Sequence, residues 1–253
     1  MNDSTHIRLI EFLSSALDIF QETLKVSKYE RTYRTGSFQI ALIARIRDRA
    51  DAVLTLLRED RDHSIAELVR AVLEAHAALH FLMAERKAIF RLELESLEDS
   101  IKMLKRTLAL PGLSQDEQSK GERSLAKRER RSKLLLAKGI RTLKKSDRIV
   151  ALGANFRVGY SILSSESHHG LDSLSDRHFD TSNGYLQITG GERHQDRTLV
   201  IYVAIVLEAI TAAMHVYATK LARSDFRSML NGKQRDIEQL LLDYDAWGAT
   251  VAQ

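Results

Sequence analysis

The sequence predicts an all-α protein, a helical bundle with an inserted long basic helical hairpin. Its 253 residues contain twelve glycines and a single proline, Pro111, which are too few to separate many short strands. Apolar residues recur at spacings of three and four along much of the chain, which is the period of an amphipathic helix. Cysteine is absent, so disulfides, thiol catalysis and Cys-ligated zinc are excluded.

Two amphipathic helices are predicted before residue 58. The apolar residues of the first are Ile10, Leu13, Leu17, Phe20 and Leu24, and those of the second are Phe38, Leu42, Ile46, Ala50, Val53 and Leu57. Each set forms a stripe along one side of its helix. Both helices should therefore pack on that side only.

A long hairpin is predicted to follow. The sequence Ser64–Glu67 is a capping box that begins a third helix. No helix breaker occurs between this box and Pro111, so we expect one unusually long helix. A second capping box, Ser114–Glu117, begins a return helix that should end near Ser146.

The predicted domains are a bundle core, residues 1–85 and 149–253, and an inserted arm, residues 86–148. The return helix of the arm is strongly basic. From Lys120 to Arg148 there are twelve Lys or Arg and three carboxylates, a net charge of +9, whereas the whole chain carries +4.

The basic return helix has two interpretations. It is either a solvated outer face of the hairpin or a footprint for a polyanion such as RNA or DNA. As part of an interaction module, it could instead dock on an acidic protein partner or on a second copy of the chain. Because it has no aromatic residue, we expect contact with RNA or DNA to involve the sugar-phosphate backbone. The predicted nucleic-acid-binding residues are Lys127, Arg128, Arg130, Arg131, Lys138 and Arg141.

The C-terminal part should complete the bundle. A helix is expected to resume near Ile149, followed by a long polar loop from Gly170 to Asp196 with a short strand at Tyr185–Thr189. The terminal helix is amphipathic, and we expect it to be broken near Asn231-Gly232.

One segment, Leu199–Ala218, is apolar and about long enough to span a bilayer. Because Glu208 and His215 lie within it, we expect a buried central helix and no membrane partner. The first residues lack the basic start and apolar run of a secretory signal, so we expect a cytoplasmic protein.

Polar residues at helical spacing form the candidate catalytic site. Arg70 and Glu74 are i, i+4 neighbours on the third helix, and Tyr160, Ser164 and His168 follow one another at the same spacing. Together they could position a phosphodiester and transfer a proton. The alternative interpretation is a buried hydrogen-bond network that joins two helices.

His76 is the second choice for the acid/base residue. With Glu74, His80, His168 and His169 it could also hold a metal ion, but such spacings arise by chance among nine histidines. No Walker loop, dinucleotide fingerprint or zincin motif occurs. We therefore expect no metal and no cofactor.

Two motifs carry a resemblance to a known family. Arg-x-x-x-Glu at Arg70–Glu74 and Tyr-x-x-Leu-Ser-x-x-x-His at Tyr160–His168 resemble the DUF5677-like proteins, an uncharacterised bacterial all-helical family. The likeness covers about residues 38–85 and 149–222. It implies the fold and the polar cluster, and no activity.

A looser likeness is to the HEPN-type helical ribonucleases, which use an Arg-x(4 to 6)-His motif, usually at a dimer interface. Arg70 and His76 fit that spacing, although Ala71 stands where that family commonly has a polar residue. This likeness implies a catalytic role for both residues.

These features lead us to expect a nucleic-acid-associated helical effector, with a metal-independent ribonuclease of bacterial defence or toxin type as its enzymatic form. The alternative is a non-catalytic interaction or scaffold module whose polar cluster is structural. A bundle with a long arm also leads us to expect a homodimer.

Overall fold

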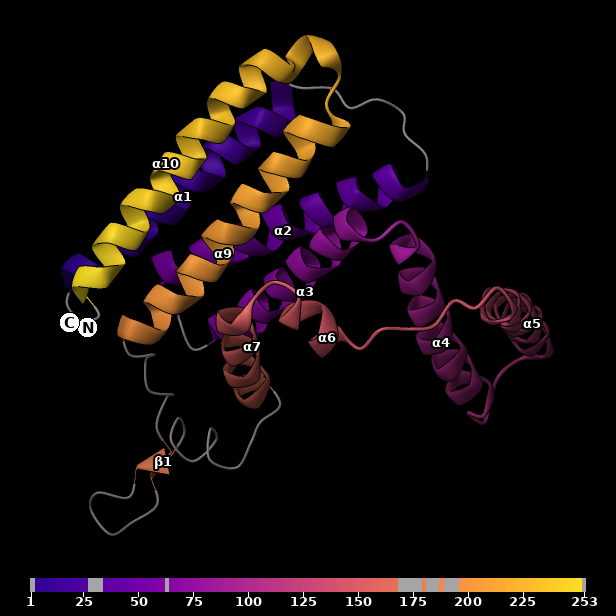
Figure 1. The fold of residues 1–253 in the computed structure, drawn as a ribbon. Helices are drawn as coiled ribbons and strands as arrows, with labels where there is room; N and C mark the ends of the chain where they lie inside the picture. The colour runs from indigo at the N-terminus through magenta and orange to yellow at the C-terminus, as the bar shows by residue number, and fades with distance from the viewer. Residues whose placement is uncertain are drawn as a thin grey trace. The chain divides into compact units, whose positions relative to one another are not determined.

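The computed structural model describes residues 3–26, 34–61, 64–167, 179–180, 187–188 and 196–251. The described chain is helical apart from its connections and one very short strand pair, which confirms the predicted all-α class (Figure 1). The helices are α1 Asp3–Val26, α2 Arg34–Arg58, α3 Ile65–Ala84, α4 Ala88–Leu108, α5 Gln115–Ala137, α6 Lys145–Val150, α7 Ala154–Ser167, α9 Asp196–Val216 and α10 Arg227–Val251.

Short elements complete the described chain. A π-helical turn, Tyr217–Leu221, extends α9, and a 3-10 turn, Ser224–Phe226, precedes α10. The strands β1 Phe179–Asp180 and β2 Gln187–Ile188 pair antiparallel. Strand β2 lies within the segment predicted as a strand.

The chain forms two compact units. Met1–His80 and Ile149–Gln253 make up the first, here called the bundle, and Phe81–Arg148 make up the second, here called the arm. In the bundle, α9 packs against α1, α2 and α10. Because α9 has several neighbours, it has buried residues on several sides, among them Leu199, Val203, Val206, Ala209, Ile210 and Ala213.

The apolar segment Arg197–Leu221 is long and apolar enough to cross a membrane by length and composition. Of its most apolar window, 61% is buried inside the structure. The core helix of a soluble protein passes the same test, so this one segment is weak evidence for a membrane span.

The prediction of one unbroken helix from residue 64 to Pro111 is wrong, because the chain leaves the helix between Ala84 and Ala88. Continuing the buried face of α3 past Leu82 would bring Arg86 onto it. The break leaves Arg86 exposed and buries Ile89 instead. The Glu85 carboxylate lies 3.1 Å from Arg91 Nε and bridges the break.

The return helix is also shorter than predicted, because α5 ends at Ala137. Gly139 has φ 74°, and the amide of Ile140 donates to Leu135 O while that of Gly139 donates to Leu136 O. This pair of bonds is a Schellman ending. Leu135 and Ile140 then pack together with Leu94 in the small core of the arm.

The predicted break near Asn231-Gly232 is wrong as well, since α10 is continuous from Arg227. Gly232 lies inside the helix with open space around its Cα, and Leu230 beside it is fully buried. A single interior glycine weakens a helix by about 1 kcal/mol, which packing of this kind can offset.

Candidate functional site

Three of the predicted site residues meet inside the bundle. Arg70 Nε donates to Glu74 Oε1 at 3.3 Å along α3, and the Tyr160 hydroxyl donates to the same oxygen at 3.4 Å from α7. The Arg70 guanidinium also lies 5.5 Å from the centre of the Tyr160 ring, within range of a cation-π interaction. These three residues are called the polar cluster below.

The polar cluster lies at the margin of the core. The side chains of Arg70 and Glu74 are 19% and 20% exposed, while their neighbours Val69 and Leu73 are fully buried. A charge at such a margin needs partners, because desolvation disfavours it. The ion pair and the phenol hydroxyl supply partners, so the arrangement is electrostatically compensated.

A glycine allows α7 to approach the core closely enough to deliver Tyr160. A Cβ at Gly159 would lie 3.3 Å from Ile205 Cδ1 of α9, closer than an ordinary contact. The sequence analysis did not use this residue. A glycine directly before Tyr160 was the available signal for a close helix approach.

The remaining members of the predicted site are Ser164 and His168. Ser164 lies one turn beyond Tyr160 on α7 and is partly buried. His168 and His169 lie outside the described residues. The proposed acid/base role of His168 therefore stays a prediction.

His76 is a buried histidine on α3. It is 7% exposed, and its ring meets Phe156 of α7 edge-on at 5.8 Å between centroids. Its Nδ1 has no hydrogen-bond partner within the described residues. Burial, with a smaller contribution from the charge of His80, lowers the pKa of His76 to about 4.

The location of His76 on α3 affects the proposed Arg-x(4 to 6)-His motif of Arg70 and His76. Six residues turn an α-helix by roughly 240°, so the two side chains leave α3 on different faces. At neutral pH the His76 ring is uncharged and cannot act as a cationic acid. Across the described residues, no group of three or more His, Cys, Asp or Glu could hold a metal ion.

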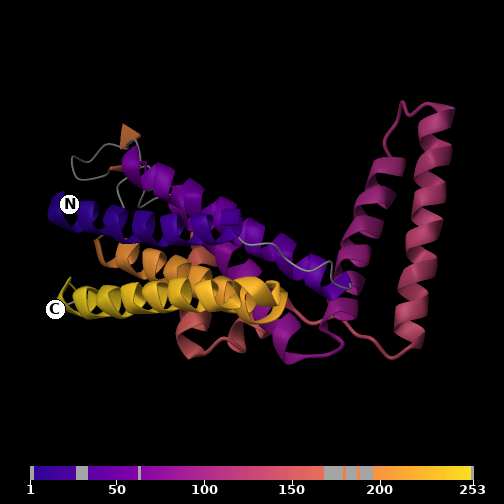
Figure 2. The ribbon, with the colours of Figure 1, turned by 90° about the horizontal axis from the view of Figure 1, so that it is seen from above.

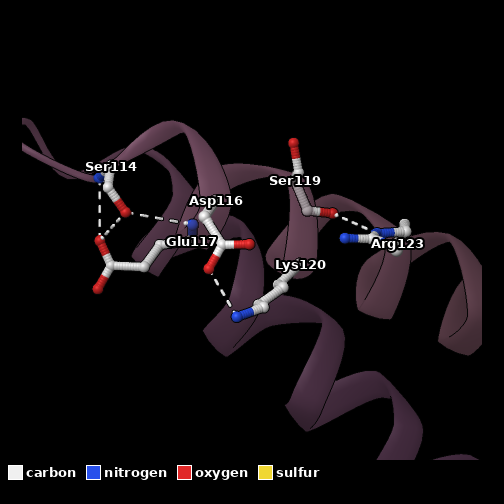
Figure 3. Close-up of polar contacts among 6 residues, drawn as sticks. All are labelled: Ser114, Asp116, Glu117, Ser119, Lys120 and Arg123. Atoms are coloured by element: carbon white, nitrogen blue, oxygen red, sulfur yellow. Dashed lines mark hydrogen bonds and ion pairs between the residues drawn. The ribbon is translucent and has the colours of Figure 1, made fainter.

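The first turns of α5 show how the basic limb is built (Figure 3). Ser114 Oγ accepts from the Glu117 amide, and the Glu117 carboxylate accepts from the Ser114 amide, which confirms the predicted capping box. Lys120 Nζ lies 2.6 Å from Asp116, and Arg123 Nε donates to the carbonyl of Ser119.

The six predicted nucleic-acid-binding residues have different surroundings. Arg131 makes a two-pronged ion pair with Glu93 of α4, with both distances 2.9 Å, and the Arg131 pKa is raised by it. Arg128 bonds to Ser124, and Arg141 donates to the carbonyls of residues 136 and 140. The side chains of Lys127, Arg130 and Lys138 are exposed.

The fold and the site define the class of protein: an all-α protein with a helical bundle, a helical hairpin arm and a compensated polar cluster. The chain belongs to the DUF5677 family, a family of unknown function whose model matches residues 36–186. The match includes the polar cluster and spans the arm. No curated protein and no solved structure matches the chain, and the likeness to HEPN-type ribonucleases gains no support.

Proposed function

We propose that this protein is a cytoplasmic nucleic-acid-associated effector whose arm binds the sugar-phosphate backbone. One observation carries the proposal. Arg123, Lys127 and Arg130 are exposed along one face of α5, and no carboxylate of the described residues pairs with any of them. Cations in such a row attract a polyanion because phosphate binding releases condensed counterions.

The test compares two double variants of equal charge. Replacing Lys127 and Arg130 by Gln removes two cations of the row, and replacing Lys220 and Arg235 by Gln removes two exposed cations of the bundle. We expect the arm variant to bind a labelled nucleic-acid duplex at least about tenfold more weakly at low salt. The bundle variant should bind within about threefold of the wild type.

Equal binding by the wild type and the arm variant would contradict the proposal. Binding of an acidic polypeptide in place of nucleic acid would favour the other function, an interaction module with an acidic protein partner.

A second proposal is ribonuclease activity at the polar cluster, of bacterial defence or toxin type. The convergence of Arg70, Glu74 and Tyr160 supports it, since an arginine can stabilise phosphate charge. His168 would transfer the proton, with His76 as the second choice.

RNA cleavage by the separate variants Arg70→Gln and His168→Gln tests this proposal. Loss of cleavage in both is expected. Unchanged cleavage in both, or a wild type that cleaves no RNA, would leave the polar cluster with a structural role only.

A further inference from the structure

Two ion pairs between α4 and α5 define two flanks of the arm. One pair joins Glu93 to Arg131, and the other joins Lys105 to Glu129 at 2.8 Å. Glu93 and Lys105 lie about 120° apart around α4, so the two pairs lie on opposite sides of the seam where the helices meet. We call the Glu93–Arg131 side the first flank and the Lys105–Glu129 side the second flank. Figure 2 shows α4 and α5 side by side along their length.

The first flank combines hydroxyl groups with cations. One row of residues from each helix lies on this flank, with successive members spaced by four, three and four positions. The α4 row is Ser96, Ser100, Met103 and Thr107, and the α5 row is Lys120, Ser124, Lys127 and Arg131. Arg123 and Arg130 lie beside the second row, on the outer face of α5.

Two carboxylates near the first flank are held by cations, and a third, Glu117 at the start of the α5 row, accepts from Ser114; Asp99 is exposed beside Ser96. Glu93 is bound by Arg131, and Asp116 is bound by Lys120. Lys127 has no such partner among the described residues and is exposed. The second flank carries Glu98, Glu122 and Glu129. Lys127 therefore lies on the first flank with no carboxylate of the described residues bound to it, beside carboxylates that already have other partners.

We infer that the first flank is a docking surface for the backbone of a nucleic-acid duplex, an inference that rests on the proposed function. Lys127 and the neighbouring Arg123 contact phosphates from α5, and the hydroxyls of Ser96 and Ser100 donate to the same backbone from α4. Thr107 contributes less, since its hydroxyl donates to the carbonyl of Met103.

The surface fits a duplex better than a single strand. The row from Lys120 to Arg131 is about 16 Å long, and a duplex presents about one charge per 1.7 Å of axis, so about ten phosphates lie alongside. Single strands are usually held by stacking on aromatic rings. The arm has only Phe81 and Phe90, and neither belongs to the two rows.

Matched double variants of the full chain test the flank. Lys127→Gln with Ser100→Glu removes a cation from the first flank and adds a carboxylate there. Lys133→Gln with Gln118→Glu makes the same change of charge on the second flank. Binding of short labelled RNA and DNA duplexes, and of one strand alone, is measured by fluorescence anisotropy, with circular dichroism as the control for folding.

We expect the first-flank variant to lose at least about tenfold in duplex affinity and the second-flank variant less than about threefold. The inference is supported if the first-flank variant binds either the RNA or the DNA duplex more weakly than the wild type does. The duplex that the wild type binds with higher affinity shows whether the natural ligand is RNA or DNA. Equal weakening by both variants overturns the flank while leaving the proposed function intact. Tighter binding of the single strand overturns the duplex class, and a wild type that binds none of these probes overturns the flank and the proposed function together.

Discussion

Tyr160 joins α7 to α3 because its hydroxyl donates to Glu74, which is already paired with Arg70. The i, i+4 spacing of Arg70 and Glu74 was enough to predict their ion pair. Helical spacing shows which residues share a face of one helix, but it does not show which other helix that face meets. The sequence therefore left open whether Arg70, Glu74 and Tyr160 form a catalytic site or a structural hydrogen-bond network. In the structure, Gly159 lets α7 approach Ile205 of α9 closely, and this places Tyr160 next to Glu74.

Replacing Tyr160 by Phe tests the cohesion of the polar cluster. The variant loses one hydrogen bond and keeps the ring, so the free energy of unfolding should fall by about 1 kcal/mol. Ser161→Ala is the control, since that hydroxyl bonds only to Arg157 O of its own helix and is exposed. Denaturant unfolding gives both values. A Tyr160→Phe protein as stable as the control would show that the hydrogen bond adds nothing to stability.

The buried His76 predicts a pH dependence of stability. Its pKa is lowered from 6.5 to about 4 in the folded protein, so between these values the unfolded chain binds the extra proton. The contribution of His76 is thus complete above pH 6.5 and is lost as the pH falls toward 4, a change on the order of 3 kcal/mol.

The variant His76→Leu should flatten this dependence, and His80→Gln, which removes only the smaller contribution to the His76 pKa shift, should change it much less. Unfolding free energies measured at several pH values between 4 and 7 make the comparison. An identical slope in the wild type and His76→Leu would contradict the buried, neutral state of His76.

At the scale of elements, helical period predicted which segments are helices and capping chemistry predicted where α5 begins. Helix ends without glycine or proline were harder. The break after Ala84 allows Ile89 to be buried and leaves Arg86 exposed. Which of the two side chains is buried depends on tertiary packing, which the sequence pattern does not show. The end of α5 was readable, since Gly139 followed by an apolar residue is typical of a Schellman ending.

Two glycine substitutions distinguish an ending from a helix interior. Gly139→Ala forces a side chain into φ 74° and should destabilise the arm by about 1 kcal/mol. Gly232→Ala lies in a helix with open space around it and should stabilise α10 by up to about 1 kcal/mol. Hydrogen exchange of the amides in each element measures both changes. Equal effects of the same sign would contradict the assigned conformations.

At the scale of the whole molecule, burial differs sharply between the two units. Between residues 95 and 131 no side chain of the arm is buried, although Leu97, Ile101, Leu104 and Leu108 form a regular apolar stripe. The stripe faces α5, where Leu97 packs on the core of the arm and Leu108 lies against Gly121, but two helices alone leave it only partly covered, and domains are normally built from packed layers. This supports the expectation of a homodimer, in which a second copy adds a layer.

Light scattering coupled to size exclusion tests the expected homodimer. The predicted mass is twice the 28.7 kDa of one chain. Ile101→Lys should shift the protein toward the monomer, because a charge in the stripe opposes its burial, and Lys102→Ala is the exposed control. A wild type that elutes with the mass of one chain at high concentration would rule the dimer out.

The sequence showed that positive charge is concentrated in the arm, but it did not show which of the arm's cations are exposed and able to bind a ligand. Helical period alone could not tell that Arg131 is held by Glu93 while Lys127 faces solvent, since both belong to the same basic run. The family match adds the fold and no activity. Function therefore depends on whether the exposed cations of α5 act as a binding surface.

The salt dependence of duplex binding by the wild-type protein tests that central claim most directly. If Arg123, Lys127 and Arg130 each neutralise a phosphate, the logarithm of the association constant should fall linearly with the logarithm of salt concentration, with a slope of about −3. The variant lacking Lys127 and Arg130 should bring the slope to about −1. A duplex affinity that does not change with salt, or that is absent even at low salt, would contradict a backbone-binding arm.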